Sequence, residues 1–257
     1  MKNIDRQILR LALPSIVSNI TVPLLGLCDV TIMGHVGGAR HIGAIAVGSM
    51  IFNVMYWLFV FLRMSTGGLT AQAYGARRWD EAQRVRRHYL LMAMGFGLAI
   101  VVLQEPLRQL TFWLMQAEGD VAALCAPYYY ICIWGAPAVL GLYVVTGWLV
   151  GMQDTRLPMV IAIGQNVVNI VTSLVLVLVF GMGITGVAIG TLVAQWAGFG
   201  VALLAARKAS KGSKPSFTSK TSDTSFTGEA SKSSGAFYLF LRTVCLVSVN
   251  LYFTSAG

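Results

Sequence analysis

Charged residues are scarce in this sequence. Only 11% of the 257 residues are charged, 56% are hydrophobic, and the mean hydropathy is +0.69. Soluble domains carry about 25% charged residues, so the composition excludes a soluble globular protein. The long apolar runs instead predict an all-α integral membrane protein, because isolated strands cannot satisfy their backbone groups in lipid.

Motifs for disulfides, metal binding and catalysis are also missing. The four cysteines form no CxxC pair, and neither HExxH nor GxSxG occurs. The histidines, all at predicted loops or helix ends, are His35, His41 and His88. We therefore expect no disulfide framework, no metal site, no cofactor and no enzymatic activity.

Seven apolar segments are present, and each predicts a membrane helix. They are Leu11–Met33, Ile42–Leu62, Tyr89–Leu103, Val121–Val150, Leu157–Phe180, Ile184–Ala206 and Ala236–Gly257. The fourth is long and contains Pro127 and Pro137, so it should either start outside the membrane core or bend, because proline removes a backbone donor and clashes with the preceding turn. Leu107–Ala117 has apolar residues at helical spacing, which fits either a helix on the membrane surface or an ordinary connecting helix.

Positive charge is distributed unevenly between the predicted loops. With the N-terminus inside, fifteen Lys and Arg residues fall in inside segments, whereas the outside loops hold only Arg40 and Arg108. This asymmetry predicts a cytoplasmic N-terminus. It also explains the net charge of +9 without nucleic acid as a partner.

A polar stretch divides the chain. Residues 207–235 are dominated by Ser, Thr, Lys and Gly, and such a segment buries too little apolar surface to fold. We expect a six-helix transmembrane lobe at 1–206, a flexible cytoplasmic linker at 207–235, and the first helix of a truncated second lobe at 236–257. The chain is therefore expected to be a fragment.

Asp29 is the only acidic residue in any of the apolar runs. A carboxylate within a membrane helix costs roughly 2.5–3.5 kcal/mol on insertion scales, so this position suggests ion or proton handling. A raised pKa would let Asp29 load and release a proton, whereas an ionised Asp29 could bind Na⁺. The structural alternative is a carboxyl near the outer interface, hydrogen-bonded to a neighbouring helix.

Polar side chains also recur on the fifth and sixth predicted helices. Three residues of the fifth helix follow i, i+3, i+7 spacing and share one face, and two residues of the sixth lie four apart. Such side chains either hold helices together or line a cavity. The group consists of Asn166, Asn169, Thr172 and Ser173, then Thr191 and Gln195.

Four segments together resemble a known family. In chain order they are LALPSIVSNITVPLLGLCDVTIMGH (11–35), RMSTGGLTAQAYGARR (63–78), GWLVGMQDTRLPM (147–159) and NVVNIVTSLVLVLVFGMGITGVAIGTLVAQW (166–196). Each is similar to a motif of the multidrug and toxic compound extrusion (MATE) transporters, with the DinF-like branch as the best match. Their order and spacing make the resemblance specific.

The resemblance implies a fold of twelve helices in two six-helix lobes, of which this chain holds the first lobe and a seventh helix. It implies an antiporter of the bacterial inner membrane that exports amphipathic, cationic organic compounds in exchange for H⁺ or Na⁺. The partners would be these small molecules and membrane lipid. Full function would need the second lobe, because repeat-based transporters move one repeat against the other.

The resemblance also assigns roles to single residues. Asp29 matches the proposed coupling-ion site, Pro14 matches the proline at the bend of the same helix, and Asn169 and Thr191 match polar residues of helices five and six. Ser173 stands where relatives with the fuller site carry a second Asp. One carboxylate instead of two should weaken Na⁺ binding, which favours H⁺ coupling.

A flippase for lipids or polysaccharide precursors has a related architecture and is the alternative. It would favour a cationic cavity for anionic headgroups, and the apolar runs hold no deep cluster of Arg. In the exporter, the polar residues Asn166, Thr172 and Gln195 would line the substrate cavity.

Overall fold

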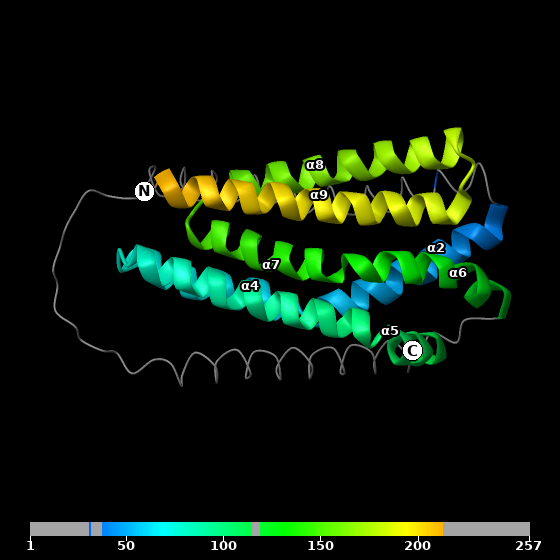
Figure 1. Cartoon of the computed structure of the whole chain (residues 1–257), viewed down its shortest axis with the longest axis horizontal. Coiled ribbons are helices and arrows are strands. Elements are labelled where there is room, and N and C mark those ends of the chain that lie inside the picture. The colour runs from blue at the N-terminus through cyan, green and yellow to red at the C-terminus, as the bar shows by residue number, and fades with distance from the viewer. Residues whose placement is uncertain (1–30, 32–37, 115–118, 213–257) are drawn as a thin grey trace, which may run out of the picture.

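The computed structural model describes residues 31, 38–114 and 119–212. Pro14, Asp29, the predicted linker beyond residue 212 and the predicted helix at 236–257 lie outside the described residues. Every regular element within the described part is helical, which confirms the expected all-α class. The order is α2 (Gly38–Trp57), α3 (Val60–Gly75), α4 (Trp79–Val102), α5 (Gln104–Leu114), α6 (Gly119–Cys132), η1 (Ile133–Gly135), α7 (Ala136–Gly151), α8 (Arg156–Leu174), η2 (Val175–Val179) and α9 (Gly183–Gly212), as Figure 1 shows.

Five helical segments of the described chain are long and apolar enough to cross a membrane. They are His41–Gly75, Trp79–Val102, Ala122–Gly151, Arg156–Val179 and Gly183–Ser210. The expected multi-pass organisation is therefore present.

The second membrane segment is longer than the expected Ile42–Leu62. After a short turn at Leu58–Phe59 the chain continues as α3 to Gly75, well beyond the end of the predicted segment. The reason is packing: a Cβ on Gly67 would lie 3.3 Å from the carbonyl oxygen of Gly147 on α7. This close approach buries the polar residues Thr66 and Thr70, and the Thr66 hydroxyl donates to the carbonyl of Leu62 at 2.6 Å.

The fourth segment contains an interruption of its α-helix, which we call the bend. Helix α6 ends at Cys132, η1 forms one 3₁₀ turn, and α7 starts with Pro137 in its first turn, where proline is tolerated because it needs no hydrogen bond. A Cβ on Gly97 of α4 would lie 2.8 Å from the nitrogen of Pro137. The bend is thus braced by α4.

Helix α5 corresponds to the short segment expected at Leu107–Ala117. It has no buried residue, and Trp113 is 76% exposed. Its first turn is tied to α6, because the Tyr130 hydroxyl donates to Oε1 of Glu105 at 2.6 Å. That hydrogen bond, followed by the contacts with Arg108, lowers the pKa of Glu105.

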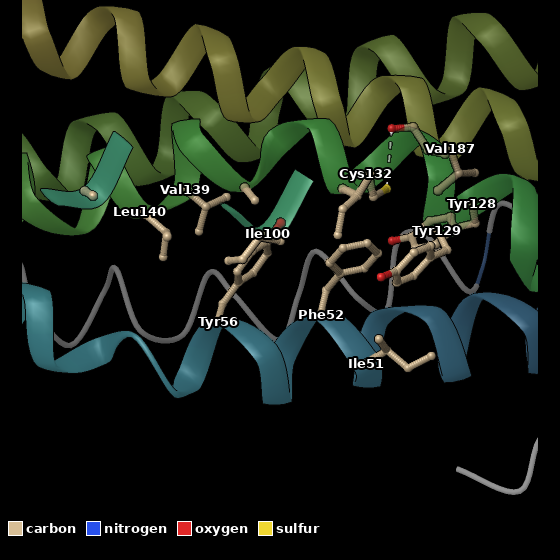
Figure 2. Close-up of a cluster of buried hydrophobic side chains, with 14 of the residues drawn as sticks. Ile51, Phe52, Tyr56, Ile100, Tyr128, Tyr129, Cys132, Val139, Leu140 and Val187 are labelled. Carbon is tan, nitrogen blue, oxygen red and sulfur yellow. Dashed lines mark hydrogen bonds between the residues drawn. The ribbon is translucent and has the colours of Figure 1, made fainter. Parts of the chain in front are cut away.

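Helix α7 is the centre of the bundle, with α9 on one side and α4 on the other (Figure 1). One core cluster joins the N-terminal half of α7 to α2 and α6. In Figure 2, Phe52 and Tyr56 of α2 point toward Tyr129 of α6 and Val139 of α7. The rings of Phe52 and Tyr129 stack at 5.5 Å between centroids. This aromatic contact fixes α2 against the bend.

Candidate functional site

Three of the predicted site residues meet between α8 and α9. Nδ2 of Asn169 donates to Oγ1 of Thr191 at 3.1 Å, and the Ser173 hydroxyl lies 3.4 Å from Oδ1 of Asn169. Asn169 is 2% exposed and Ser173 is fully buried. The Thr191 hydroxyl in turn donates to the carbonyl of Val187 at 3.0 Å. We call Asn169, Ser173 and Thr191 the polar triplet.

Glycine on α9 makes this approach possible. A Cβ on Gly190 would lie 2.9 Å from the backbone nitrogen of Ser173 and would overlap its hydroxyl. Gly186, one turn earlier, faces Leu176 and Val177 in the same way, at 3.1–3.3 Å. The GxxxG spacing of these glycines therefore serves helix packing, and it brings the polar triplet to hydrogen-bond distance.

The polar triplet carries no charge of its own. An amide and two hydroxyls can donate and accept hydrogen bonds, but a cation would need further oxygen ligands or a carboxylate. Within the described ranges, no group of three or more His, Cys, Asp or Glu side chains could hold a metal ion.

The other predicted cavity residues do not all join the triplet. Asn166 and Thr172 are half-buried on α8. Gln195 lies one turn after Thr191, yet its Oε1 occupies the space beside Gly135 of η1. That buried oxygen has no hydrogen-bond partner among the described residues, so Gln195 belongs to the contact between α9 and η1.

The predicted coupling residue Asp29 and the predicted bend at Pro14 lie outside the described residues. The structure therefore places neither of them relative to the polar triplet.

An open cavity between α2 and α7 was not predicted from the sequence. Its volume is about 310 Å³, and it is lined by Asn53, Val54, Trp57 and Tyr143. The lining combines an amide with two aromatic rings that each carry a polar atom. One signal was available: Asn53 is the only amide residue in the apolar run Ile42–Leu62.

The MatE family profile matches residues 14–175, which is more than half of the chain. The chain belongs to the MatE family. The resemblance expected from the four motifs is thus confirmed, and the family agrees with the expectation that the protein is not an enzyme.

Two curated MatE relatives illustrate the similarity. The chain is 39% identical to the DNA damage-inducible protein F of Escherichia coli over 207 aligned residues. The alignment covers 80% of this chain and 45% of that protein. It is 23% identical to the probable multidrug resistance protein NorM of Thermotoga maritima over 202 aligned residues. That alignment covers 77% of this chain and 43% of the relative. The chain therefore spans less than half the length of these relatives.

Solved structures show the same fold. A multidrug resistance MATE transporter in an outward-facing conformation superposes with a TM-score of 0.70 at 24% identity, covering 76% of this chain and 43% of that one. A transporter of the MOP superfamily from Pyrococcus furiosus superposes with a TM-score of 0.78 at 22% identity, covering 96% and 54%. The matched extent agrees with one lobe of a MatE transporter.

Proposed function

We propose that this chain is the N-terminal lobe of an antiporter that exports amphipathic, cationic organic compounds in exchange for H⁺. The observation that supports this function best is the buried polar triplet of Asn169, Ser173 and Thr191 between α8 and α9. Relatives described as multidrug resistance and multidrug export proteins support the same class of activity.

In this proposal Asp29 carries the coupling ion and the polar triplet is its neutral hydrogen-bonding environment. Ser173 leaves the site with a single carboxylate, which favours a proton over Na⁺ because hard cations prefer more anionic oxygen ligands. Protonation would remove the charge of Asp29 and free the side chain to move, and a bend at Pro14 would accommodate that movement.

The substrate would bind where polar and aromatic side chains line open space. The cavity of Asn53, Trp57 and Tyr143 offers ring faces, which attract cations electrostatically. We propose that Asn166 and Thr172 of α8 add polar groups elsewhere on the substrate path, whereas Gln195 serves the contact between α9 and η1.

The domain organisation completes the proposal. Residues 1–206 would form the lobe, and α9 extends beyond it to Gly212. The rest of the stretch to residue 235 would be a flexible cytoplasmic linker, and 236–257 the first helix of the second lobe. The protein would lie in the bacterial inner membrane with a cytoplasmic N-terminus. Export would need the second lobe.

A binding experiment on the 257-residue chain tests the site without requiring transport. A fluorescent organic cation is titrated against the purified chain at alkaline and acidic pH, for the unaltered protein and for Asp29→Asn. We expect tight binding at alkaline pH, release on acidification, and loss of this pH response in Asp29→Asn. Asp154→Asn, outside the predicted apolar runs, is the control and should keep the response.

Transport is then measured in cells that express the chain joined to a second six-helix lobe. Dye efflux that Asp29→Asn abolishes would support the antiporter. Unchanged pH-driven efflux in Asp29→Asn would overturn the role of Asp29, and translocation of lipid without dye efflux would favour the flippase.

A further inference from the structure

A second cluster of side chains lies at the C-terminal end of α7, around Trp148. Trp148 is 1% exposed, and its Nε1 donates to the carbonyl of Ala82 on α4 at 3.0 Å. The guanidinium carbon of Arg86, one turn further along α4, lies 4.7 Å from the centre of the Trp148 ring. The indole is thus a fixed platform on which a half-buried cation rests.

Two more cations lie near this platform. Arg87 follows Arg86 on α4, and Arg207 follows Ala206 of α9, which belongs to the same buried core cluster as Trp148. The core cluster of Trp148 therefore brings one arginine of α4 and one of α9 to the same end of α7. We call Arg86, Arg207 and Trp148 the basic platform.

Among the described residues, ion pairs join Arg78 to Glu81 and Arg108 to Glu105, and neither pair involves Arg86 or Arg207. Glu81 pairs with Arg78 at 3.1 Å. Oδ1 of Asp154 accepts the backbone N–H groups of Arg156 and Leu157 at the start of α8, at 3.1 and 3.2 Å. A partly desolvated cation that lacks an anionic partner is costly, so the site is complementary to an anion from outside the described chain.

Apolar side chains adjoin the basic platform. Leu90 and Met94 of α4 and Leu203 of α9 are half-buried and pack against the same core cluster as Trp148. A Cβ on Gly141 of α7 would lie 2.9 Å from the Met94 methyl carbon and 2.8 Å from Cζ of Phe199, so side chains of α4 and α9 reach toward each other over α7. Cations at one end of an apolar strip match a phosphate headgroup followed by an acyl chain.

We propose that Arg86 and Arg207, above the Trp148 ring, bind the phosphate of an anionic phospholipid whose acyl chain lies along Leu90, Met94 and Leu203. Arginine presents paired N–H groups that fit phosphate oxygens. The sequence predicts this end of the bundle to be cytoplasmic, where anionic lipids attract basic residues of membrane proteins. The bound lipid would bridge α4 and α9, whose contact with each other is at most marginal.

The test uses the purified 257-residue chain in detergent. Retained lipid is counted by native mass spectrometry, and binding is titrated with phosphatidylglycerol, with phosphatidylcholine of the same acyl chains, and with inorganic phosphate. We expect selective binding of phosphatidylglycerol that weakens as salt is added. If phosphatidylcholine binds as tightly as phosphatidylglycerol, the proposed role of charge is wrong. If inorganic phosphate binds as tightly as phosphatidylglycerol, the proposed role of the acyl chain is wrong.

Variants locate the site. Arg86→Gln and Arg207→Gln should each weaken phosphatidylglycerol binding roughly fivefold, as expected for the loss of one interfacial cation. Arg84→Gln is the matched control, because Arg84 is an exposed arginine of the same helix and should bind lipid as the unaltered chain does. Arg207 is also exposed, so Arg207→Gln decides the question if Arg86→Gln does not fold. An equal loss in Arg84→Gln, or no loss in Arg207→Gln, would overturn the proposal.

Discussion

Helices α7 and α8 are neighbours of similar length, yet they are buried in different ways. Twelve of the 16 residues of α7 are buried, and they are apolar residues, proline or glycine. Helix α8 has 19 residues, of which only Pro158, Ile161, Asn169 and Ser173 are buried. The comparison separates two tasks: α7 holds the lobe together, whereas α8 keeps an apolar outer surface and places its polar side chains against α9.

The largest effect should come from removing the anchor of α7. Trp148→Ala deletes a fully packed side chain and its hydrogen bond to Ala82, so we expect the free energy of unfolding to fall by about 3–5 kcal/mol. Thermal unfolding of the purified chain in detergent measures this loss. Trp113→Ala on α5, where the side chain is 76% exposed, is the control. An equally small change in both variants would contradict the central role of α7.

A smaller loss is expected at the interface between α3 and α7. A Cβ on Gly147 would lie 2.5 Å from the carbonyl oxygen of Arg63, so Gly147→Val must push the helices apart, at a cost of about 1–3 kcal/mol. Gly164→Val on α8 introduces the same side chain where nothing lies within 4 Å. Similar melting temperatures for the two glycine variants would contradict the claim that α7 is packed more closely than α8.

The polar triplet should contribute less to stability than α7 does. Asn169→Leu and Thr191→Val each remove one side of the 3.1 Å hydrogen bond, and such interhelical bonds contribute about 0.6–2 kcal/mol in membranes. A double-mutant cycle on thermal unfolding measures the coupling directly. Additive losses would mean that the two side chains do not stabilise each other.

The smallest effect belongs to the outer face of α8. Val167 is 54% exposed, so Val167→Ala removes little packing and should change the free energy of unfolding by less than about 0.5 kcal/mol. The same melting assay applies, with Val144→Ala on α7 as the buried counterpart. A larger loss in Val167→Ala than in Val144→Ala would reverse the comparison.

The sequence predicted most helices because long apolar runs and proline positions carry that information. It missed the continuation of α3 to Gly75, because the apolar run ends at Leu62 and the polar residues Ser65, Thr66 and Thr70 follow it. These residues are buried only because Gly67 lets α3 approach Gly147 of α7. A contact between distant segments decided that boundary, and helical periodicity does not report such contacts.

The candidate site, like the helices, was predicted only in part from the sequence. Spacing placed Asn169 and Ser173 on one face, and the family resemblance added Thr191, which does hydrogen-bond to Asn169. The same i, i+4 reasoning grouped Gln195 with Thr191, but Gln195 packs against Gly135 instead. Periodicity predicts which residues share one face of a helix. Which neighbouring helix each of them contacts depends on how the whole bundle packs.

The turn between α8 and α9 has a consequence for how the protein enters the membrane. Gly181 and Gly183 have positive φ angles of 64° and 53°, a conformation that glycine adopts at little cost, and they allow an abrupt reversal of the chain. The hydrogen bond between Asn169 and Thr191 lies within the hairpin that this reversal creates. The two helices can therefore shield each other's polar groups as soon as both have been synthesised, so the hairpin is suited to leave the translocation machinery as one unit, ahead of its assembly with α7.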